Sequence, residues 1–457
     1  MSGYQGFVTL PPALIDMIQT GMLAREFQEG LDSWLAYRRS SVEEIIPARI
    51  GQTLTYTRYG RKPPVSTPLN PSNNTNFDNG LTPTDAPIEQ YILQMNEWGD
   101  TTDVNLVDSQ TAIADNVQRV SRNTGVQAAQ SLERIARLRL FSAYLGGNTR
   151  VRTDLGASTT TTCHVDDIRG FQYVLVNGSP TPVSSVNVLS VTEYNTFGSG
   201  IDQTLSVTGV VADSSNQSSV PDGISGTLTF NTATAPVEGD ALIAANAPSI
   251  LRPEGKITTA QLSSSDILTM SMLEDAKTVL SNNAVPPFED GTYHIVLDNT
   301  SMRQLFADQD FKVLYAGRYN SAEYREGMVF TLLGMTFVPT TEAYVQNAMG
   351  SSSTDVSVRV RRPIVLGDGS LIEGTSEVTR TWSKERGAAA SIMDIGMVNN
   401  VALVMRPPID RLGQWLGVSW VWIGDYAVPT DITATTAIIP TASSALYKRG
   451  VVLETAG

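Results

Sequence analysis

The chain has 457 residues, 41% of them hydrophobic and 17% charged, which is enough for two or three domains around a large buried core. Its net charge of −14 excludes a protein that grips nucleic acid over its whole surface, because such binding needs clustered Lys and Arg. The single cysteine, Cys163, excludes an intrachain disulfide and a cysteine metal cluster.

The low charged fraction has two explanations that composition alone does not separate. Large subunit interfaces are depleted of charge, and a Ser/Thr/Asn-rich β-protein also carries few charges. The N-terminus, MSGYQGFVTLPP, lacks the basic region and apolar core of a secretory signal. The apolar segment Trp415 to Gly424 is far shorter than the ~20 residues that cross a bilayer, so we expect no membrane partner.

Residues 1–51 predict an N-terminal helical arm. Leu14, Ile18 and Met22 recur at helical spacing, and further apolar residues continue the pattern past Gly30. The alternative is an ordinary helix that packs on its own core; the arm interpretation requires it to touch another copy.

Residues 52–107 predict an extended loop. A strand pattern at Thr53 to Tyr59 leads into a segment, 60–87, with six prolines and five asparagines, and a second extended segment follows at Ile88 to Trp98. A segment this poor in apolar side chains cannot form a core, and long loops inside compact domains are usually functional or disordered. Strand patterns on both sides favour a projecting two-stranded arm over a free linker.

Residues 108–153 predict a long spine helix and part of a peripheral domain. An apolar stripe at spacings of three and four runs through Ile113, Val117, Val120, Thr124, Ala128, Leu132, Ile135, Leu138, Phe141 and Leu145. The helix is expected to span Ser109 to Leu145 and to stop at Gly146-Gly147, with Gly125 as a point where it kinks or divides.

Residues 154–255 differ in composition from the rest of the chain. They contain no Met, Trp or Lys, and they carry ten acidic residues against Arg169 and Arg252. Short β-like runs at 186–191, 204–211 and 226–231 alternate with turn residues, which predicts an inserted β-rich domain. A decorated meander of the surrounding domain is the alternative.

Residues 256–457 predict a mixed α+β domain whose strands come from distant parts of the chain. A helix is expected at 264–281, a strand at Tyr293 to Leu297 and a further helix after Ser301. The later strands are expected at 328–333, 336–338, 397–405, 414–423 and 447–453. The overall fold class is therefore α+β.

Motifs for catalysis are sparse. The only histidines are His164 and His294, and neither belongs to a metal-ligand set or stands near a Gly-x-Ser-x-Gly elbow. No phosphate-binding glycine loop follows a strand. We therefore expect no catalytic residues, no metal and no cofactor, and we expect that the protein is not an enzyme. Paired carboxylates in the acidic insert leave a glycosidase open.

Clustered arginines stand out in this acidic chain. Arg119, Arg122, Arg134, Arg137 and Arg139 follow the long helix, and Arg359, Arg361 and Arg362 form a second group. One interpretation is a solvated helix face with a few ion pairs inside the chain. The other is that these arginines pair with acidic residues of neighbouring subunits or present positive charge toward DNA. The candidate intersubunit contacts are Arg58, Arg61, Lys62, Arg134, Arg137, Arg139, Arg361 and Arg362.

The order of these elements resembles the major capsid proteins of tailed bacteriophages, whose fold is shared with herpesvirus shells. The resemblance lies in the arm at 1–51, the extended loop at 52–107, the spine helix, and the strand-helix unit at Gly291 to Phe306 with Phe311 and Tyr315. Glu326-Gly327-Met328-Val329 and Gly334-Met335-Thr336-Phe337-Val338 are similar to a glycine-punctuated hairpin of a podovirus-type branch. The insert at 154–255 departs from the minimal pattern.

This resemblance implies peripheral and axial domains and subunits that form hexamers and pentamers of an icosahedral head in the virion, assembled in the bacterial host's cytoplasm. It implies packaged double-stranded DNA next to the shell but not sequence-specifically bound, a portal, and in some relatives a decoration protein. Only about 50 residues precede the first strand, so a separate scaffolding protein is expected. The competing hypotheses are a carbohydrate-active or adhesive surface protein that uses the acidic insert, and a surface-layer lattice protein.

Overall fold

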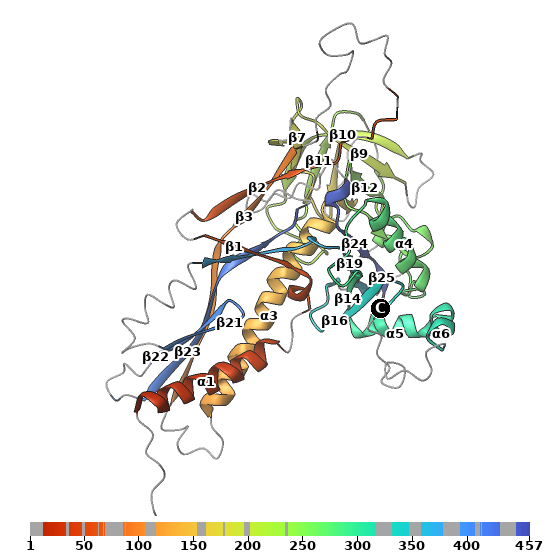
Figure 1. Cartoon of the computed structure of the whole chain (residues 1–457). Coiled ribbons are helices and arrows are strands. Elements are labelled where there is room, and N and C mark those ends of the chain that lie inside the picture. Colours follow the sequence, from red (N-terminus) through yellow and green to blue (C-terminus); the bar gives the residue numbers. More distant parts are fainter. Residues whose placement is uncertain are drawn as a thin grey trace, which may run out of the picture.

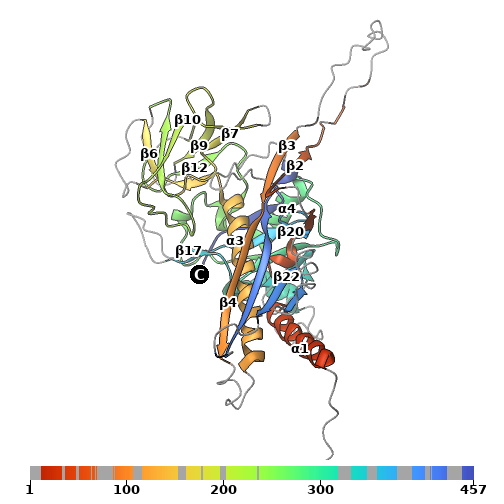
Figure 2. The ribbon, with the colours of Figure 1, turned by 90° about the vertical axis from the view of Figure 1, so that its left-hand side faces the viewer.

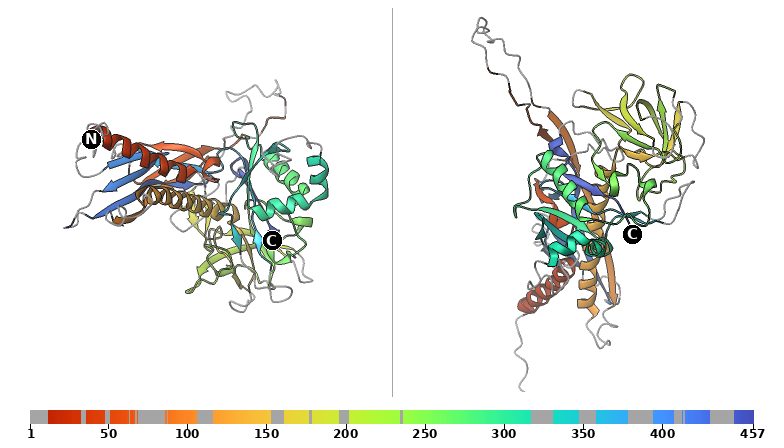
Figure 3. Two further views of the ribbon diagram at one scale, coloured as in Figure 1. Left: turned by 90° about the horizontal axis from the view of Figure 1, so that it is seen from below. Right: turned by 90° about the vertical axis from the view of Figure 1, so that its right-hand side faces the viewer.

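The computed structural model shows a mixed α+β protein with one long helix and several sheets, which confirms the predicted fold class (Figure 1). The structure describes residues 12–32, 36–47, 51–62, 64–66, 68, 86, 88–105, 116–152, 161–176, 179–195, 202–233, 236–316, 331–346, 358–377, 394–406, 412, 414–429 and 445–457. An elongated unit contains the long helix, a β-rich unit lies to one side of it, and an α/β unit holds the C-terminus (Figure 3). The three largest clusters of buried apolar side chains correspond mainly to these three units.

The predicted long helix is α3, Asn116–Leu145, in the elongated unit. The predicted first turns, residues 109–115, lie outside the described residues. The helix buries Ala128, Leu132 and Phe141 completely, because these positions fall on the apolar stripe that faces the sheet behind it. Gly147 has a φ of 76°, a left-handed conformation that glycine adopts without a Cβ clash, and the helix ends before it.

Gly125 neither kinks nor divides α3, which runs unbroken through it. The residue lies instead where the N-terminal helix α1, Pro12–Asp32, crosses α3. A Cβ on Gly125 would stand 2.3 Å from the carbonyl oxygen of Phe27, and a Cβ on Gly30 would stand 2.5 Å from that of Arg122. The two glycines therefore allow the helix backbones to approach more closely than larger residues permit. The described part of the predicted arm thus packs on its own chain.

The sheet beside α3 is formed by β1, β20, β23, β22 and β21 in that order, with β4 added on β23. Its strands are β1 (Val42–Ile46), β4 (Asn96–Asn105), β20 (Ile372–Ser376), β21 (Asp394–Val398), β22 (Val401–Arg406) and β23 (Trp415–Ala427). Residues 417–421 of β23 pair with both β22 and β4, so those two strands lie on opposite edges of β23. Helix α3 packs along β23, and α1 contacts β21. Trp422, Tyr37 and Phe141 are fully or almost fully buried between these layers.

The predicted extended loop divides into two parts. Strands β2, Thr53–Tyr59, and β3, Ile88–Gln94, pair antiparallel as expected, with Tyr59 opposite Ile88. After Met95 the chain continues into β4, which pairs along its whole length with β23 (Figure 2). Residues 96–105 therefore belong to the main sheet of the same chain, and β2–β3 form a separate hairpin. Residues 69–85 of the predicted loop lie outside the described residues.

The prediction of a single strand at 397–405 is wrong, because the structure has a hairpin there. Strands β21 and β22 pair antiparallel around Asn399 and Asn400, with Val398 opposite Val401. Both asparagines have positive φ angles, 47° and 65°, as a two-residue type I′ turn requires. The apolar residues on both sides obscured this turn, although asparagine is one of the few residues that tolerates the conformation.

Replacing Asn400 by Val is expected to lower the free energy of unfolding by about 1–2 kcal/mol, because a β-branched side chain is strained at a φ of 65°. Asn400→Gly is the matched control, since glycine accepts this conformation and removes the same side-chain hydrogen bond to Glu43. Thermal unfolding of both variants measures the difference. Equal stability of the valine and glycine variants would show that turn geometry is not the cause.

The β-rich unit follows α3 directly. Its sheet has the order β5-β12-β9-β10-β11-β6, and a separate hairpin, β7–β8, lies beside it (Figure 2). The strands are β5 (Asn148–Arg150), β6 (Thr162–Val165), β7 (Tyr173–Val176), β8 (Ser179–Pro182), β9 (Leu189–Tyr194), β10 (Gln203–Ala212), β11 (Gly226–Phe230) and β12 (Ala241–Ala244). A core that includes Phe171, Val191 and Leu228 belongs to this unit alone. The sheet thus begins at Asn148, before the boundary predicted at 154.

The α/β unit is built on a mixed sheet of order β13-β24-β19-β14-β16-β15. These strands are β13 (Ile250–Leu251), β14 (Tyr293–Leu297), β15 (Thr331–Leu332), β16 (Met335–Pro339), β19 (Ile364–Leu366) and β24 (Gly450–Leu453). The helices are α4 (Met270–Asn282), α5 (Asn299–Ala307) and α6 (Gln309–Ala316), and a small sheet joins β17 (Val345–Gln346), β18 (Val360–Arg361) and β25 (Thr455–Ala456). Asp298 caps α5 by accepting hydrogen bonds from two backbone N–H groups.

Short 3-10 helices connect these parts: η1 (Arg38–Ser40), η3 (Pro253–Gly255), η4 (Thr259–Gln261) and η6 (Ala445–Tyr447). Among the described residues, no helix is long and apolar enough to cross a membrane.

Candidate assembly surface

The hairpin β2–β3 is a two-stranded sheet at one end of the elongated unit. It extends away from the elongated unit at the end opposite α1 (Figure 2). Within the described residues its two strands pair only with each other, so the outer edge of each carries unpaired backbone groups. Tyr59 is 65% exposed and its partner Ile88 is 53% exposed. Unpaired strand edges beside exposed apolar side chains are typical of a surface that another chain covers.

The base of the hairpin is anchored by aromatic residues. Tyr56 and Tyr91 stack with their ring centroids 5.3 Å apart, and burial raises the pKa of both phenols above its ordinary value. Leu93 is fully buried, and a Cβ on Gly374 would stand only 2.2 Å from its side chain, so Gly374 makes room for it. The hairpin is therefore held firmly at the sheet and exposed toward its far end.

The three cations predicted on the hairpin have different environments. Arg58 is buried, with its guanidinium carbon 4.8 Å from the ring centroid of Tyr447 and 5.8 Å from that of Tyr91. Such cation–π contacts use Arg58 inside the chain, where it links the hairpin to η6. Arg61 and Lys62, just beyond β2, are exposed. Of these three side chains, Arg61 and Lys62 have the accessibility that an intersubunit contact needs.

The predicted arginines of α3 pair within the chain. Arg134 donates to Glu342 at 2.9 Å, and Arg137 lies 3.6 Å from the same carboxylate. Hydrogen bonds and charge from Arg134 hold the pKa of Glu342 below its ordinary value. Arg139 pairs with Asp425 at 2.8 Å. Internal pairs thus account for these three, and Arg134, which is more than half exposed, retains a surface for a further contact.

Arg361 and Arg362 are neighbours in sequence but join different ion pairs. Arg361 pairs with Asp298, the cap of α5. Arg362 is almost completely buried and donates to Glu454 at 2.8 Å. Their predicted intersubunit role stays a prediction, and the contacts in the structure assign both of them to the interior of the α/β unit.

Glu133 is a buried carboxylate on α3, next in sequence to Arg134. It is fully buried in α3 and accepts hydrogen bonds from the backbone N–H groups of Tyr37, at 2.9 Å, and Arg38, at 3.1 Å. Burial raises the pKa of Glu133 to about 7, although these hydrogen bonds act in the opposite direction. Glu133 thus fastens the segment after α1 to the long helix.

His294 lies between a serine hydroxyl and a carboxylate, as the histidine of a serine hydrolase does. Its Nδ1 lies 3.1 Å from the Ser40 hydroxyl, and its Nε2 lies 3.2 Å from a carboxylate oxygen of Asp290. Ser40, however, is fully buried, and the ring of Phe288 stacks on His294 at 4.0 Å. A nucleophile must reach its substrate, so this arrangement fastens η1 to β14 rather than performing acyl transfer.

The other predicted chemical residues are also structural. Cys163 is fully buried, and burial raises the pKa of its thiol to about 12, which leaves it unreactive. His164 lies 3.8 Å from Asp213, and the described residues contain no group of three or more His, Cys, Asp or Glu placed to hold a metal ion.

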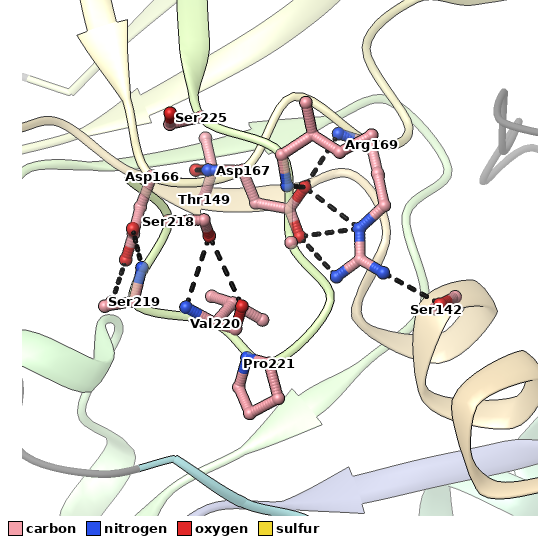
Figure 4. Close-up of polar contacts among 12 residues, drawn as sticks. Ser142, Thr149, Asp166, Asp167, Arg169, Ser218, Ser219, Val220, Pro221 and Ser225 are labelled. Atoms are coloured by element: carbon pink, nitrogen blue, oxygen red, sulfur yellow. Dashed lines mark hydrogen bonds and ion pairs between the residues drawn. The ribbon is translucent and has the colours of Figure 1, made fainter. Parts of the chain in front are cut away.

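Two adjacent carboxylates of the acidic insert are held by arginines. Asp167 pairs with Arg169 at 2.6 Å, and Arg169 also donates to the Ser142 hydroxyl on α3 (Figure 4). Asp166 pairs with Arg150 at 3.1 Å. Asp167, through Arg169, therefore connects the β-rich unit to α3, and Asp166 is engaged within the β-rich unit.

Comparison with known proteins gives structural matches only. No family model and no curated protein matches the chain. The capsid of Ralstonia phage GP4 resembles it with 10% sequence identity and a TM-score of 0.46, over 92% of this chain and 91% of that chain. The capsid of Cyanophage P-SCSP1u has 10% identity and a TM-score of 0.44, over 92% of this chain and 88% of that chain. The capsid of Cyanophage Pam1 has 12% identity and a TM-score of 0.44, over 90% of this chain and 87% of that chain. Because the identities and scores are this low, the likeness adds nothing to the geometry described above.

Proposed function

We propose that the chain is the major capsid protein of a tailed double-stranded DNA bacteriophage, and that it assembles into the hexamers and pentamers of an icosahedral head. The projecting hairpin β2–β3 carries this proposal. It is anchored by Tyr91 and Leu93, unpaired at both outer edges within the described residues, and apolar at Tyr59 and Ile88. A second copy that covers this surface would bury the strand edges and the apolar side chains.

Other features are consistent with an assembly function. The long helix, the crossing helix and the inserted β-rich unit follow the order in which the sequence resembles the capsid family. Several ionisable groups singled out in the sequence form internal contacts, as His294 does with Ser40 and Arg362 with Glu454. The net charge of −14 would keep the shell from adhering to packaged DNA.

The finer parts of the proposal rest on the sequence resemblance alone. They are the podovirus-type branch, a separate scaffolding protein, a portal and a decoration protein. The division into peripheral and axial domains belongs with them, as do intersubunit contacts of Arg61, Lys62 and Arg134.

The double substitution Tyr59→Asp with Ile88→Asp tests the hairpin surface. Both side chains are more than half exposed, but the two carboxylates would lie opposite each other, so the isolated chain is expected to keep its fold with a free energy of unfolding lower by about 1–2 kcal/mol. Two carboxylates at the centre of an apolar contact would be desolvated without partners, so closed particles and capsomers are expected to be lost. Electron microscopy and analytical ultracentrifugation measure the assembly state.

Val186→Asp with Val211→Asp is the matched control. These valines are 85% and 65% exposed, and they lie on the β-rich unit rather than on the hairpin. Normal assembly is expected for the control pair. Unchanged assembly of the Tyr59/Ile88 variant would exclude the hairpin as an intersubunit surface, and a wild-type chain that stays monomeric at high concentration, with and without a scaffold, would contradict the proposed function itself.

A further inference from the structure

A small polar cavity lies where the β-rich unit meets the α/β unit. Its volume is about 40 Å³. Asn148, Thr149 and Arg150 line it from the β-rich unit, and Arg252 and Arg362 line it from the other side. Figure 4 shows part of this wall around Thr149. One water molecule needs roughly 10–15 Å³, so the cavity has room for several waters or for one small polyatomic ion.

The α/β side of the cavity carries an excess of positive charge. Arg252 donates to one oxygen of Glu454 at 2.7 Å, and Arg362 donates to the other at 2.8 Å. Charge from these two guanidinium groups holds the pKa of Glu454 below its ordinary value against the opposing effect of burial. All three side chains are at least nine-tenths buried. Two cations thus share one carboxylate, and a buried charge without a full counter-charge is unfavourable.

Arg362 also has an unused hydrogen-bond donor. Its Nε is bonded to Glu454 and its Nη2 to the side-chain oxygen of Gln346, whereas its buried Nη1 has no hydrogen-bond partner. The guanidinium carbon of Arg362 lies over the ring of Tyr344, 5.5 Å from its centroid. This face-on contact supplies no acceptor in the plane of the guanidinium group. Buried donors are nearly always satisfied, so this orphan, on a side chain that also lines the cavity, points to a missing acceptor.

The acidic residues in the same wall do not supply this acceptor. Asp166 is bonded by Arg150 at 3.1 Å and by Arg152 at 3.2 Å. It also accepts from the backbone N–H of Ser219 at 2.7 Å. Asp167 is bonded by Arg169. Because these carboxylates are already engaged, they do not offset the charge of the Arg252–Glu454–Arg362 group.

We propose that this cavity binds a small inorganic oxyanion of the phosphate or sulfate class, with Arg362 and Arg252 as its charged ligands. A planar guanidinium presents paired N–H donors that match two oxygens of such an ion. Because residues of both units line the cavity, the bound anion joins the β-rich unit to the α/β unit. The proposal does not depend on whether the chain forms a shell.

Thermal unfolding of the full chain tests this proposal. Sodium phosphate or sulfate is titrated while sodium chloride keeps the ionic strength constant. A saturable rise in Tm with either oxyanion, absent with chloride alone, is expected because a ligand that binds only the folded state stabilises it. Arg362→Lys keeps the positive charge beside Glu454 but loses the paired donors, so its apparent affinity for phosphate is expected to fall at least about tenfold.

Arg361→Lys is the matched control. This neighbouring arginine pairs with Asp298 and does not line the cavity, so an unchanged phosphate response is expected. If Arg362→Lys does not fold, Arg252→Lys replaces it, with the same expected loss. No oxyanion-specific rise in Tm would overturn the proposal in favour of bound water, and an equal rise in the cavity variants would indicate an adventitious ion only. A rise in Tm with a short DNA duplex but not with phosphate, lost in Arg362→Lys, would mean that the cavity binds nucleic-acid phosphates. That result would overturn the proposal of a free inorganic anion.

Discussion

Replacing Gly125 by Val is expected to separate α1 from α3 and to lower the free energy of unfolding by about 3 kcal/mol or more. The position of a Cβ at residue 125 is only 2.3 Å from the carbonyl oxygen of Phe27, and both groups belong to helix backbones that cannot rotate away. Valine adds two methyl groups at the same point. The gain in helix propensity over glycine, below about 1 kcal/mol, is too small to offset this overlap.

Thermal unfolding and trypsin cleavage at Arg25 measure the two parts of this prediction. Arg25 lies on α1, and its cleavage is expected to accelerate once the helix is no longer docked. Gly125→Ala is expected to give a smaller loss of the same kind. Gly417→Ala is the control, because a Cβ there meets its nearest neighbour at 3.5 Å, an ordinary contact distance. A Gly125→Val protein with wild-type stability and wild-type cleavage would refute the crossing geometry.

This helix crossing marks a limit of prediction from sequence. Periodicity found α3 because an apolar stripe repeats along it, and it found the helical segment of α1 for the same reason. Periodicity gives no information on which helices touch, so Gly125 appeared as a weak point within one helix. Only the position of Phe27 on the second helix explains why glycine is needed there.

The strands show the same division between local and distant information. The pairing of β2 with β3 was predictable, because two β-like runs flank a single loop. The pairing of β4 with β23 joins residues more than 300 positions apart. The sequence of β4 is mostly polar, with Trp98 and Val104 as its only large apolar residues, so it does not indicate which strand it pairs with. The extended loop was therefore expected to end later than the projecting hairpin does.

The candidate site was predictable at the level of a surface but not of its side chains. The Pro/Asn-rich segment between two strand patterns indicated a projecting hairpin. The arginine clusters indicated contact residues, yet Arg139 and Arg362 find their carboxylates at Asp425 and Glu454, far away in the sequence. Charge alone cannot distinguish an internal ion pair from an interface, because the same chemistry serves both.

Replacing Glu133 by Ala is expected to lower the free energy of unfolding by about 2–4 kcal/mol at neutral pH. The substitution leaves the backbone N–H groups of Tyr37 and Arg38 without their acceptors, and each unsatisfied buried donor costs about 1–3 kcal/mol. It also opens a cavity in the fully buried centre of α3. Glu274→Ala, at an exposed position of α4, is the matched control and is expected to change stability by less than about 0.5 kcal/mol.

The pH dependence of stability gives a sharper test of Glu133. Burial raises the pKa of this carboxyl from 4.5 to about 7. Between pH 4.5 and about 7 the folded chain therefore still holds a proton that the unfolded chain has released. The resulting stabilisation is complete below about pH 4.5 and is lost as the pH rises through about 7. As the pH rises from 5 to 8, the free energy of unfolding of the wild type is therefore expected to fall by about 2–3 kcal/mol relative to that of Glu133→Gln, which cannot titrate.

The groups around Glu133 do not produce this difference themselves. Arg38 is fixed by its 2.7 Å ion pair with Glu373, and burial keeps the pKa of the Tyr37 phenol far above this pH range. Other titrating residues are common to both proteins and cancel in the comparison. Thermal unfolding of wild type and Glu133→Gln at pH 5, 6, 7 and 8 measures the divergence. Parallel pH profiles would mean that Glu133 is charged throughout, held by its backbone donors despite complete burial.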